Sequence, residues 1–224
     1  MVTRIRGYSL ASCVTDGGVR SDGCAPTSTG HPPVRRVGRL PYEPVFVSRS
    51  LEEPLVVLGI DPGLTRCGFA AVQANGPGGA IALSLGVIKT PPSDPLPKRL
   101  AELRHEFAAL MREFRPHVVA VEQVFFQNNV RTAMSVGQAS GLALAEAWAC
   151  GCEVVQYTPN QVKGAVAGWG AADKLQVQKM VQARLGLSSI PKPADAADAA
   201  ALALCHLAMA PLRQRIRQAN AGAR

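Results

Sequence analysis

The chain has 224 residues, 47% of them hydrophobic, with 24 Lys and Arg against 16 Asp and Glu and a formal net charge of +8. This length allows one domain of ordinary size with an extension, or two small domains at most. The longest apolar runs are far shorter than the ~20 residues that cross a bilayer, and the start of the chain lacks the ~7 to 15 apolar residues of a secretory signal, so we expect neither class of protein. The six cysteines are scattered without zinc-site spacing, which predicts reduced thiols and a cytoplasmic location.

Residues 1–54 differ in composition from the rest of the chain. They contain six Gly, six Pro and six Ser, a third of the segment, and no sustained apolar period, so we predict a disordered N-terminal extension. Residues 55–224 carry 17 basic against 11 acidic residues, which makes the predicted folded part itself basic and is a modest indication of a polyanionic partner. We predict one folded domain over 55–212 and a basic C-terminal tail over 213–224.

From residue 55 onward the predicted elements are three strands, a helix, a strand, a helix, a strand and three further helices. Short continuous apolar runs predict buried strands, and apolar residues at helical spacing predict amphipathic helices. This order indicates a mixed sheet with helices packed around it. The predicted strands are 55–60, 67–74, 80–90, 117–121 and 153–157, and the predicted helices are 96–114, 130–149, one begun by Thr158 and Pro159, one from Asp173 through Leu185, and 193–217.

Four acids stand among apolar or small residues, where Asp and Glu are rare unless something pairs with them. Two of them each follow a predicted buried strand, and the other two are three residues apart and share one face of a helix. Taken singly, each has an ordinary structural interpretation, as a turn residue, a carboxylate at the sheet rim or an acid at a helix N-terminus. Together they indicate a site, because the carboxyl ends of strands are where an open α/β sheet binds ligands. The acids are Asp61, Glu122, Asp195 and Asp198.

Grouped carboxylates repel one another unless a cation lies between them. Oxygen-only ligands select hard ions such as Mg²⁺ or Mn²⁺ over zinc. Two such ions ~4 Å apart can hold the attacking water and the leaving oxygen of a phosphodiester. The four acids therefore predict metal-dependent phosphodiester hydrolysis.

Five sequence blocks, in order over about residues 55–206, resemble the RuvC family of Holliday-junction resolvases. The resemblance implies an α/β RNase H-like fold with a mixed five-stranded sheet flanked by helices, and a homodimer. It also implies Mg²⁺-dependent paired, symmetrical nicking of two opposed strands at a four-way DNA junction, in recombination and repair, together with the RuvA–RuvB branch-migration complex. The blocks are Gly59–Gly63 with Cys67 and Gly68, Val121–Phe126, Gly137–Ala139, Gln161–Lys163 and Ala194–Ala199.

The resemblance also assigns roles to residues. It implies that Asp61, Glu122, Asp195 and Asp198 bind two metal ions, with Asp61 bridging them, and that Mn²⁺ can replace Mg²⁺. Lys163 and Lys174 match two basic residues near the scissile phosphates, where a charge can stabilise the transition state. For both lysines the ordinary alternative is a solvated helix face.

Further positions bear on DNA contact. Phe125 matches an aromatic residue that the family directs at bases near the crossover, against the alternative of core packing. Asn128 and Ser140 stand where many relatives have basic residues, and Arg131 is the candidate substitute for a phosphate contact. His206 lies two helical turns beyond Asp198, and we interpret it as a packed or surface histidine rather than a ligand.

Three other functions remain as alternatives. An actin-like ATPase or sugar kinase also has a first strand ending in Asp-x-Gly, as at Asp61, but would need a second such loop. A ribosomal-RNA processing nuclease of the YqgF type shares the acids, and a non-catalytic junction-binding module would not need them. The extension over residues 1–54 is either a start codon assigned too early or a basic arm that adds non-specific DNA affinity.

Overall fold

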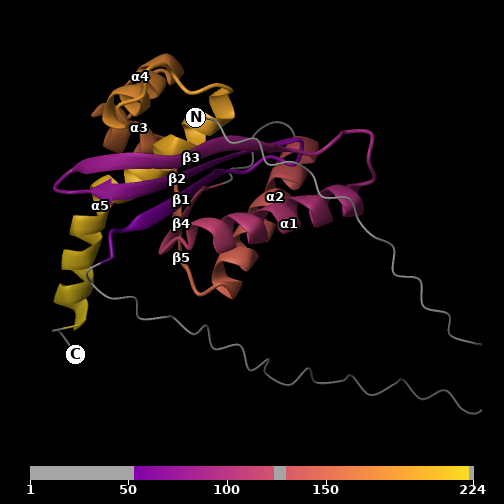
Figure 1. Cartoon of the computed structure of the whole chain (residues 1–224), viewed down its shortest axis with the longest axis horizontal. Coiled ribbons are helices and arrows are strands. Elements are labelled where there is room, and N and C mark those ends of the chain that lie inside the picture. Colours follow the sequence, from indigo (N-terminus) through magenta and orange to yellow (C-terminus); the bar gives the residue numbers. More distant parts are fainter. Residues whose placement is uncertain (1–52, 124–129, 222–224) are drawn as a thin grey trace, which may run out of the picture. The chain divides into compact units, whose positions relative to one another are not determined.

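The computed structural model describes residues 53–123 and 130–221, and every predicted strand and helix is present in it (Figure 1). Residues 1–52 of the predicted extension lie outside the described part. The strands are β1 (Val56–Asp61), β2 (Arg66–Asn75), β3 (Gly79–Lys89), β4 (Val118–Glu122) and β5 (Glu153–Tyr157), and the helices are α1 (Leu96–Phe114), α2 (Val130–Ala149), α3 (Pro159–Ala167), α4 (Lys174–Arg184) and α5 (Ala194–Ala221).

The five strands form one mixed sheet in the order β3-β2-β1-β4-β5, which confirms the predicted architecture. Strands β1, β4 and β5 run parallel, and β2 and β3 are joined to them by antiparallel pairing. The carboxyl ends of the three parallel strands therefore meet at one edge of the sheet. This is the edge where the chain leaves the sheet after Asp61, Glu122 and Tyr157.

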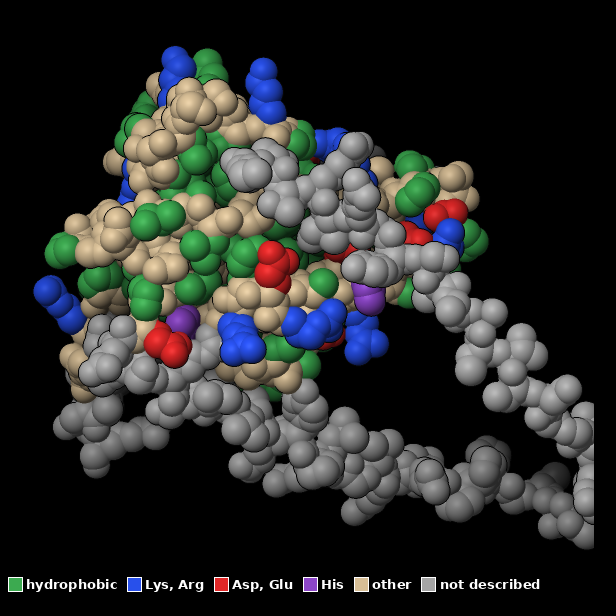
Figure 2. Space-filling model, viewed as in Figure 1, with side chains coloured by type: hydrophobic (Ala, Val, Ile, Leu, Met, Phe, Trp, Pro, Cys, Tyr) green, Lys and Arg blue, Asp and Glu red, His purple; other side chains and the backbone are tan. Residues whose placement is uncertain are grey.

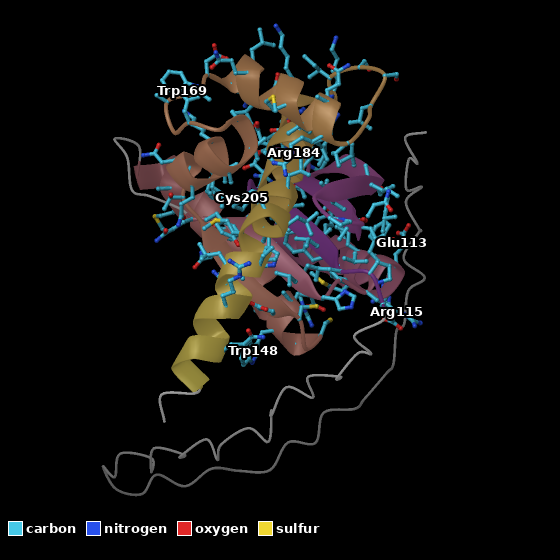
Figure 3. The ribbon with its side chains drawn as sticks, turned by 90° about the vertical axis from the view of Figure 1, so that its left-hand side faces the viewer. Glu113, Arg115, Trp148, Trp169, Arg184 and Cys205 are labelled. Carbon is cyan, nitrogen blue, oxygen red and sulfur yellow. The ribbon has the colours of Figure 1, made fainter. Side chains whose placement is uncertain are left out.

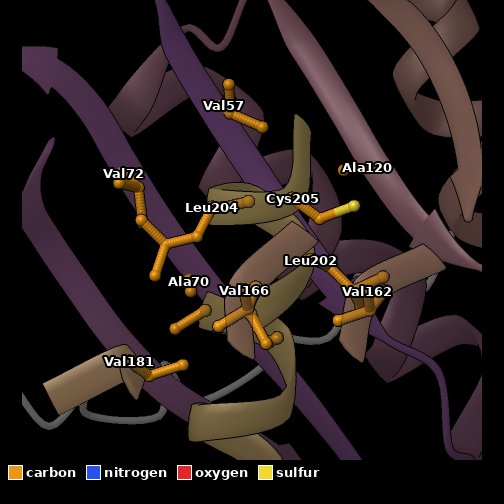
Figure 4. Packing of buried hydrophobic residues seen from close by; sticks show 14 of the residues in the cluster. Val57, Ala70, Val72, Ala120, Val162, Val166, Val181, Leu202, Leu204 and Cys205 are labelled. Atoms are coloured by element: carbon orange, nitrogen blue, oxygen red, sulfur yellow. The ribbon is translucent and has the colours of Figure 1, made fainter. Parts of the chain in front are cut away.

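Helices cover both faces of the sheet, and the two faces are packed differently. On one face α5 lies on β1 and β2, with α3 and α4 packed outside it (Figures 1 and 4). The buried part of α5 consists largely of alanine, and small side chains allow a helix to approach the sheet closely. On the other face α1 buries larger side chains, among them Leu103, Phe107 and Leu110, whereas α2 buries alanines.

Helix α5 is longer than the sequence predicted. It continues through Ala221, so the boundary predicted between residues 212 and 213 lies inside one helix. The Gln, Arg and Ala residues beyond Pro211 are good helix formers, and a helix already nucleated upstream extends through them. Within the described part, Ala194–Arg213 is long and apolar enough to cross a membrane, but 56% of it is buried inside the protein, as in a core helix.

Candidate active site

Asp61 and Glu122 stand at the ends of two neighbouring parallel strands. Asp61 is the last residue of β1, and Glu122 is the last residue of β4. In the parallel ladder Ile60 is opposite Val121, so the two acids occupy the next pair of positions. Because both strands end at the same edge of the sheet, the two carboxylates are brought to that edge together.

Close approach of α5 to the sheet brings its two acids to the same edge. Gly68 is opposite Asp61 in the antiparallel ladder, and a Cβ atom added to Gly68 would overlap the backbone oxygen of Asp195. A Cβ atom added to Gly59 would likewise overlap the backbone oxygen of Ala199. Helix α5 therefore rests directly on the backbone of β1 and β2, and this contact places its first turns beside the end of β1.

Lys163 and Lys174 come from two helices whose starting points are fixed by hydrogen bonds. Lys163 lies within α3, and Lys174 is the first residue of α4. Each helix begins with a capping box: the side chain of Thr158 or Asp173 accepts a hydrogen bond from the backbone N–H three residues on, and the Gln at that position accepts one from the cap's own N–H. Such caps determine where a helix begins. They therefore determine which residues of α3 and α4 face the acids.

One cavity of about 480 Å³ collects the predicted catalytic residues. Its floor is apolar and comes from α3, α4 and α5, and its polar lining is supplied by the four acids and the two lysines. All six residues that the sequence singles out for catalysis thus lie together. The lining consists of Asp61, Glu122, Lys163, Lys174, Asp195 and Asp198 with Pro159, Val162, Val177, Ala201 and Leu202.

Three further residues that the sequence singles out are Phe125, Arg131 and His206. Phe125 lies outside the described residues, and Arg131 is in the first turn of α2 with its side chain outside them. His206 is buried within α5, and its Nδ1 is 2.9 Å from the hydroxyl oxygen of Tyr157. This placement confirms the interpretation of His206 as a packed histidine.

Two ion pairs engage the acids of α5. Nη2 of Arg66 lies 2.6 Å from Oδ2 of Asp195, and Nζ of Lys174 lies 2.6 Å from Oδ2 of Asp198. The hydrogen bond to Asp198 is the main cause of a raised pKa for Lys174. Arg66 was missed by sequence reasoning. The sequence does contain an indication of its position. Side chains of a strand alternate between the two faces of the sheet, so Arg66 lies on the same face as Gly68, the face that α5 covers.

The pKa values of the acids diverge with their surroundings. The pKa of Asp61 is raised from 3.8 to about 7, first by burial and then by the charges of Glu122, Asp198 and Asp195. Burial, followed by the charge of Asp198, also raises the pKa of Glu122. Burial alone would raise the pKa of Asp195, but the hydrogen bond from Arg66 and nearby positive charge lower it below its usual range. The buried end of the cavity thus disfavours ionisation of Asp61 and Glu122, because the nearby cations do not offset burial and the charges of the other acids.

The donor chemistry of the cavity fits a hard divalent ion. Among residues 53–123 and 130–221, no three His, Cys, Asp or Glu side chains are grouped so that they could hold one metal ion in this conformation. Arg66 and Lys174 instead engage two of the four carboxylates. Carboxylate oxygens are the ligands that Mg²⁺ and Mn²⁺ prefer, and an ion would relieve the repulsion that raises the pKa of Asp61. By donor chemistry the four acids suit such an ion, although Asp195 and Asp198 are engaged in ion pairs in this conformation.

Comparison with known proteins gives a match over most of the described chain. The family model described as crossover junction endodeoxyribonuclease RuvC matches residues 57–206. A protein of that name from Desulfitobacterium hafniense is 49% identical over 152 residues, which cover 68% of this chain and 92% of the relative. This match favours the junction nuclease over the actin-like ATPase and the ribosomal-RNA processing nuclease.

Solved structures agree with the sequence match. The structure of Thermus thermophilus RuvC is 41% identical, with a TM-score of 0.67 over 70% of this chain and 96% of that chain. The same protein in complex with a Holliday junction substrate has a TM-score of 0.68 at 40% identity, with the same coverage. A yeast mitochondrial Holliday junction resolvase, 18% identical with a TM-score of 0.53 over 72% of this chain and 85% of that chain, shares the fold. These similarities confirm the predicted RNase H-like fold.

Proposed function

Because the chain belongs to the RuvC family of crossover junction endodeoxyribonucleases, which are metal-dependent Holliday junction resolvases, we propose that its acid-lined cavity makes paired, symmetrical nicks in two opposed strands of a four-way junction. The observation that supports this most directly is the gathering of four acids and two lysines, from five different elements, around one cavity. The four carboxylates can bind cations, and the two lysines can bind a phosphate in the same cavity.

We assign the metal ligands to Asp61, Glu122, Asp195 and Asp198, with two Mg²⁺ ions as the natural occupants and Mn²⁺ as a substitute. When bound, the ions supply Lewis-acid chemistry that activates a water and stabilises the leaving oxygen. The raised pKa of Asp61 supports this assignment, because a buried acid among other acids needs positive charge nearby to ionise fully at neutral pH.

The two lysines act on the phosphate rather than on the acids alone. If Asp198 held a metal ion, Lys174 would contact the scissile phosphate instead of that carboxylate, and Lys163 would contact the phosphate from α3. A fixed positive charge in a partly enclosed cavity stabilises the charge that develops on the phosphate oxygens. Water adds to phosphorus, the bond to the 3′ oxygen breaks, and the proton passes to that oxygen. The products are a 5′-phosphate and a ligatable 3′-hydroxyl.

The assembly follows from the reaction. Each nick uses one such cavity, so two simultaneous nicks in opposed strands call for a homodimer with one cavity in each protomer. We assign Phe125 to contact with bases near the crossover and Arg131 to a phosphate contact. The nuclease domain over 55–212 then acts in the cytoplasm with the RuvA–RuvB complex, and residues 1–54 are an extension outside it.

The test compares a synthetic four-way junction with a linear duplex of the same sequence, each incubated with the full-length chain and Mg²⁺. We expect symmetrical nicks in two opposed strands of the junction, products that a DNA ligase reseals, and no cleavage of the duplex. Asp61→Asn should bind the junction without cutting it. Nicking by Asp61→Asn at the normal rate would remove Asp61 from the mechanism, and equal cutting of the duplex would contradict junction resolution.

A second pair of variants separates the lysines of the cavity from lysines elsewhere. Lys163→Ala should slow cleavage more than it weakens junction binding, because its charge acts on the transition state. Lys179→Ala is the matched control, since Lys179 is exposed on α4 and is not part of the cavity lining. Equal effects of the two substitutions would assign Lys163 to general DNA attraction only.

A further inference from the structure

Trp169 is the largest exposed apolar side chain near the cavity. It lies in the loop between α3 and α4 with 56% of its surface exposed. The chain has two tryptophans, and the other, Trp148, lies near the end of α2 (Figure 3). A single exposed apolar side chain is ordinary on a protein surface, so the significance of Trp169 depends on what lies beside it.

The loop that carries Trp169 is held in place by its own backbone. Gly168 adopts a left-handed conformation with φ of +87°, and its N–H donates to the carbonyl of Gly164 over 3.0 Å. The carbonyl of Trp169 accepts a hydrogen bond from the N–H of Ala172 over 3.3 Å. The capping box of Asp173 follows at once. The indole is therefore presented from a fixed turn, which lowers the entropy lost when something stacks on it.

This turn joins the two helices that supply the lysines of the cavity, although none of its own residues is part of the cavity lining. Lys163 precedes Trp169 by six residues on α3, Lys174 follows it by five on α4, and both lysines line the cavity. A Cβ atom added to Gly170 would lie 3.7 Å from the carbonyl oxygen of Asn160, the residue after Pro159 of the cavity lining. The turn thus packs against the first turn of α3, beside the cavity.

Lys163 and Lys174 bring positive charge into the cavity itself. Figure 2 shows further Lys and Arg side chains over several parts of the face in view. The exposed indole comes between the two helices that supply the lysines of the cavity. A flat aromatic surface beside fixed positive charge is the combination that single-stranded and unpaired nucleic acid recognises.

We propose that Trp169 stacks on a nucleobase of the junction strand that enters the cavity, and so positions the scissile phosphate between Lys163 and Lys174. The inference rests on the proposed function, because it takes the cavity as the place where a DNA strand is cut. Stacking on an aromatic face tolerates every base, so Trp169 adds affinity and position without strong sequence preference. A protein partner that covers the indole is the other reading, and the experiment separates the two.

The first measurement uses Trp169 as its own reporter. In the full-length Trp148→Phe variant, Trp169 is the single tryptophan, and stacking on a base should quench its fluorescence and shift it when a four-way junction is added in EDTA, which prevents cleavage. Binding is followed independently by the anisotropy of a dye on a distant junction arm. Quenching that saturates with the anisotropy supports stacking. Full binding with unchanged tryptophan emission overturns it, and absence of binding instead contradicts the proposed function.

The second measurement compares substitutions. Trp169→Ala should weaken junction binding about tenfold, the effect of losing one base–aromatic stack. Trp169→Tyr should restore most of that affinity, whereas Trp169→Leu, which is apolar but has no aromatic face, should not. Trp148→Ala is the matched control and should bind as the parent does. Equal affinity of all four variants, or rescue by leucine, would overturn the stacking role and favour an apolar protein contact.

Discussion

The two faces of the sheet are both buried, yet only one of them builds a site. On the α1 and α2 face, large side chains of α1 such as Leu103 and Phe107 fill the space between helix and sheet, whereas α2 contributes alanines. On the α5 face, glycines of β1 and β2 let the helix backbone rest directly on the strands. Large side chains tolerate small shifts, whereas backbone contact fixes position within a fraction of an ångström. The acids stand on the face where position is fixed most tightly.

The substitution Gly68→Ala disturbs the contact between α5 and the sheet, and it should have the largest effect because it lowers both cleavage and stability. The new Cβ would overlap the backbone of Asp195, so α5 has to move away from Asp61. We expect about a hundredfold loss of junction cleavage, with about 1–3 kcal/mol lost from the free energy of unfolding. The control is Gly141→Ala on α2, where a Cβ would meet nothing within 4 Å. Normal cleavage by a folded Gly68→Ala protein would contradict the role given to this contact.

Phe107→Ala tests the opposite face. Phe107 is fully buried between α1 and the sheet, so truncation should lower the free energy of unfolding by about 3–5 kcal/mol. Cleavage per folded molecule should stay close to that of the parent, because no residue of the cavity lies on this face. Urea unfolding gives the stability, and cleavage is measured below the unfolding transition. A loss of cleavage in fully folded protein would show that the faces are coupled.

The raised pKa of Asp61 predicts how the metal-free protein responds to pH. A carboxyl whose pKa rises on folding contributes stability below its unfolded value of 3.8 and loses that contribution as pH rises through about 7. The free energy of unfolding of the parent, minus that of Asp61→Asn, should therefore fall between pH 4 and pH 7, by an amount on the order of 4 kcal/mol. Mg²⁺ above pH 7 should stabilise the parent more than the variant. A difference independent of pH would contradict the shift.

Arg66→Ala should have the smallest effect of these substitutions. It compares an ion pair on the α5 face with one on the α1 and α2 face through their effects on Mg²⁺ binding. Arg66 occupies Asp195 in the absence of metal, so its removal should tighten Mg²⁺ binding about two- to fivefold, the range for a partly exposed ion pair. Isothermal titration without DNA measures this directly. Arg104→Ala removes a similar pair, Nε of Arg104 to Oε2 of Glu146 at 3.2 Å, on the α1 and α2 face. Unchanged Mg²⁺ affinity in the Arg66 variant, or an equal gain in the control, would show that Arg66 does not compete with the ion.

Much of the fold could be predicted because its signals are local. The buried run before Asp61, the capping residues Thr158 and Asp173, and the apolar spacing of residues 96–114 each specify an element within a few positions. The helix predicted over 193–217 already runs through Pro211, and it stops short of the end of α5 at Ala221 because the last residues have no apolar spacing that marks a helix end. The four acids could be recognised from the sequence because charged residues rarely stand among apolar ones.

Taken by itself, the sequence determined which elements form, which four acids are the candidates for the site and which family the chain resembles, because each of these depends on residue type and short-range spacing. Only the tertiary structure decided that Arg66 pairs with Asp195, that Trp169 stands exposed beside the cavity, and that Gly59 and Gly68 carry the backbone of α5. These are contacts between residues far apart along the chain, up to 129 positions for Arg66 and Asp195. The spacing of residues along a sequence does not predict the distance between such residues in space. The pairing of the strands and the packing of α5 on the sheet determine that distance.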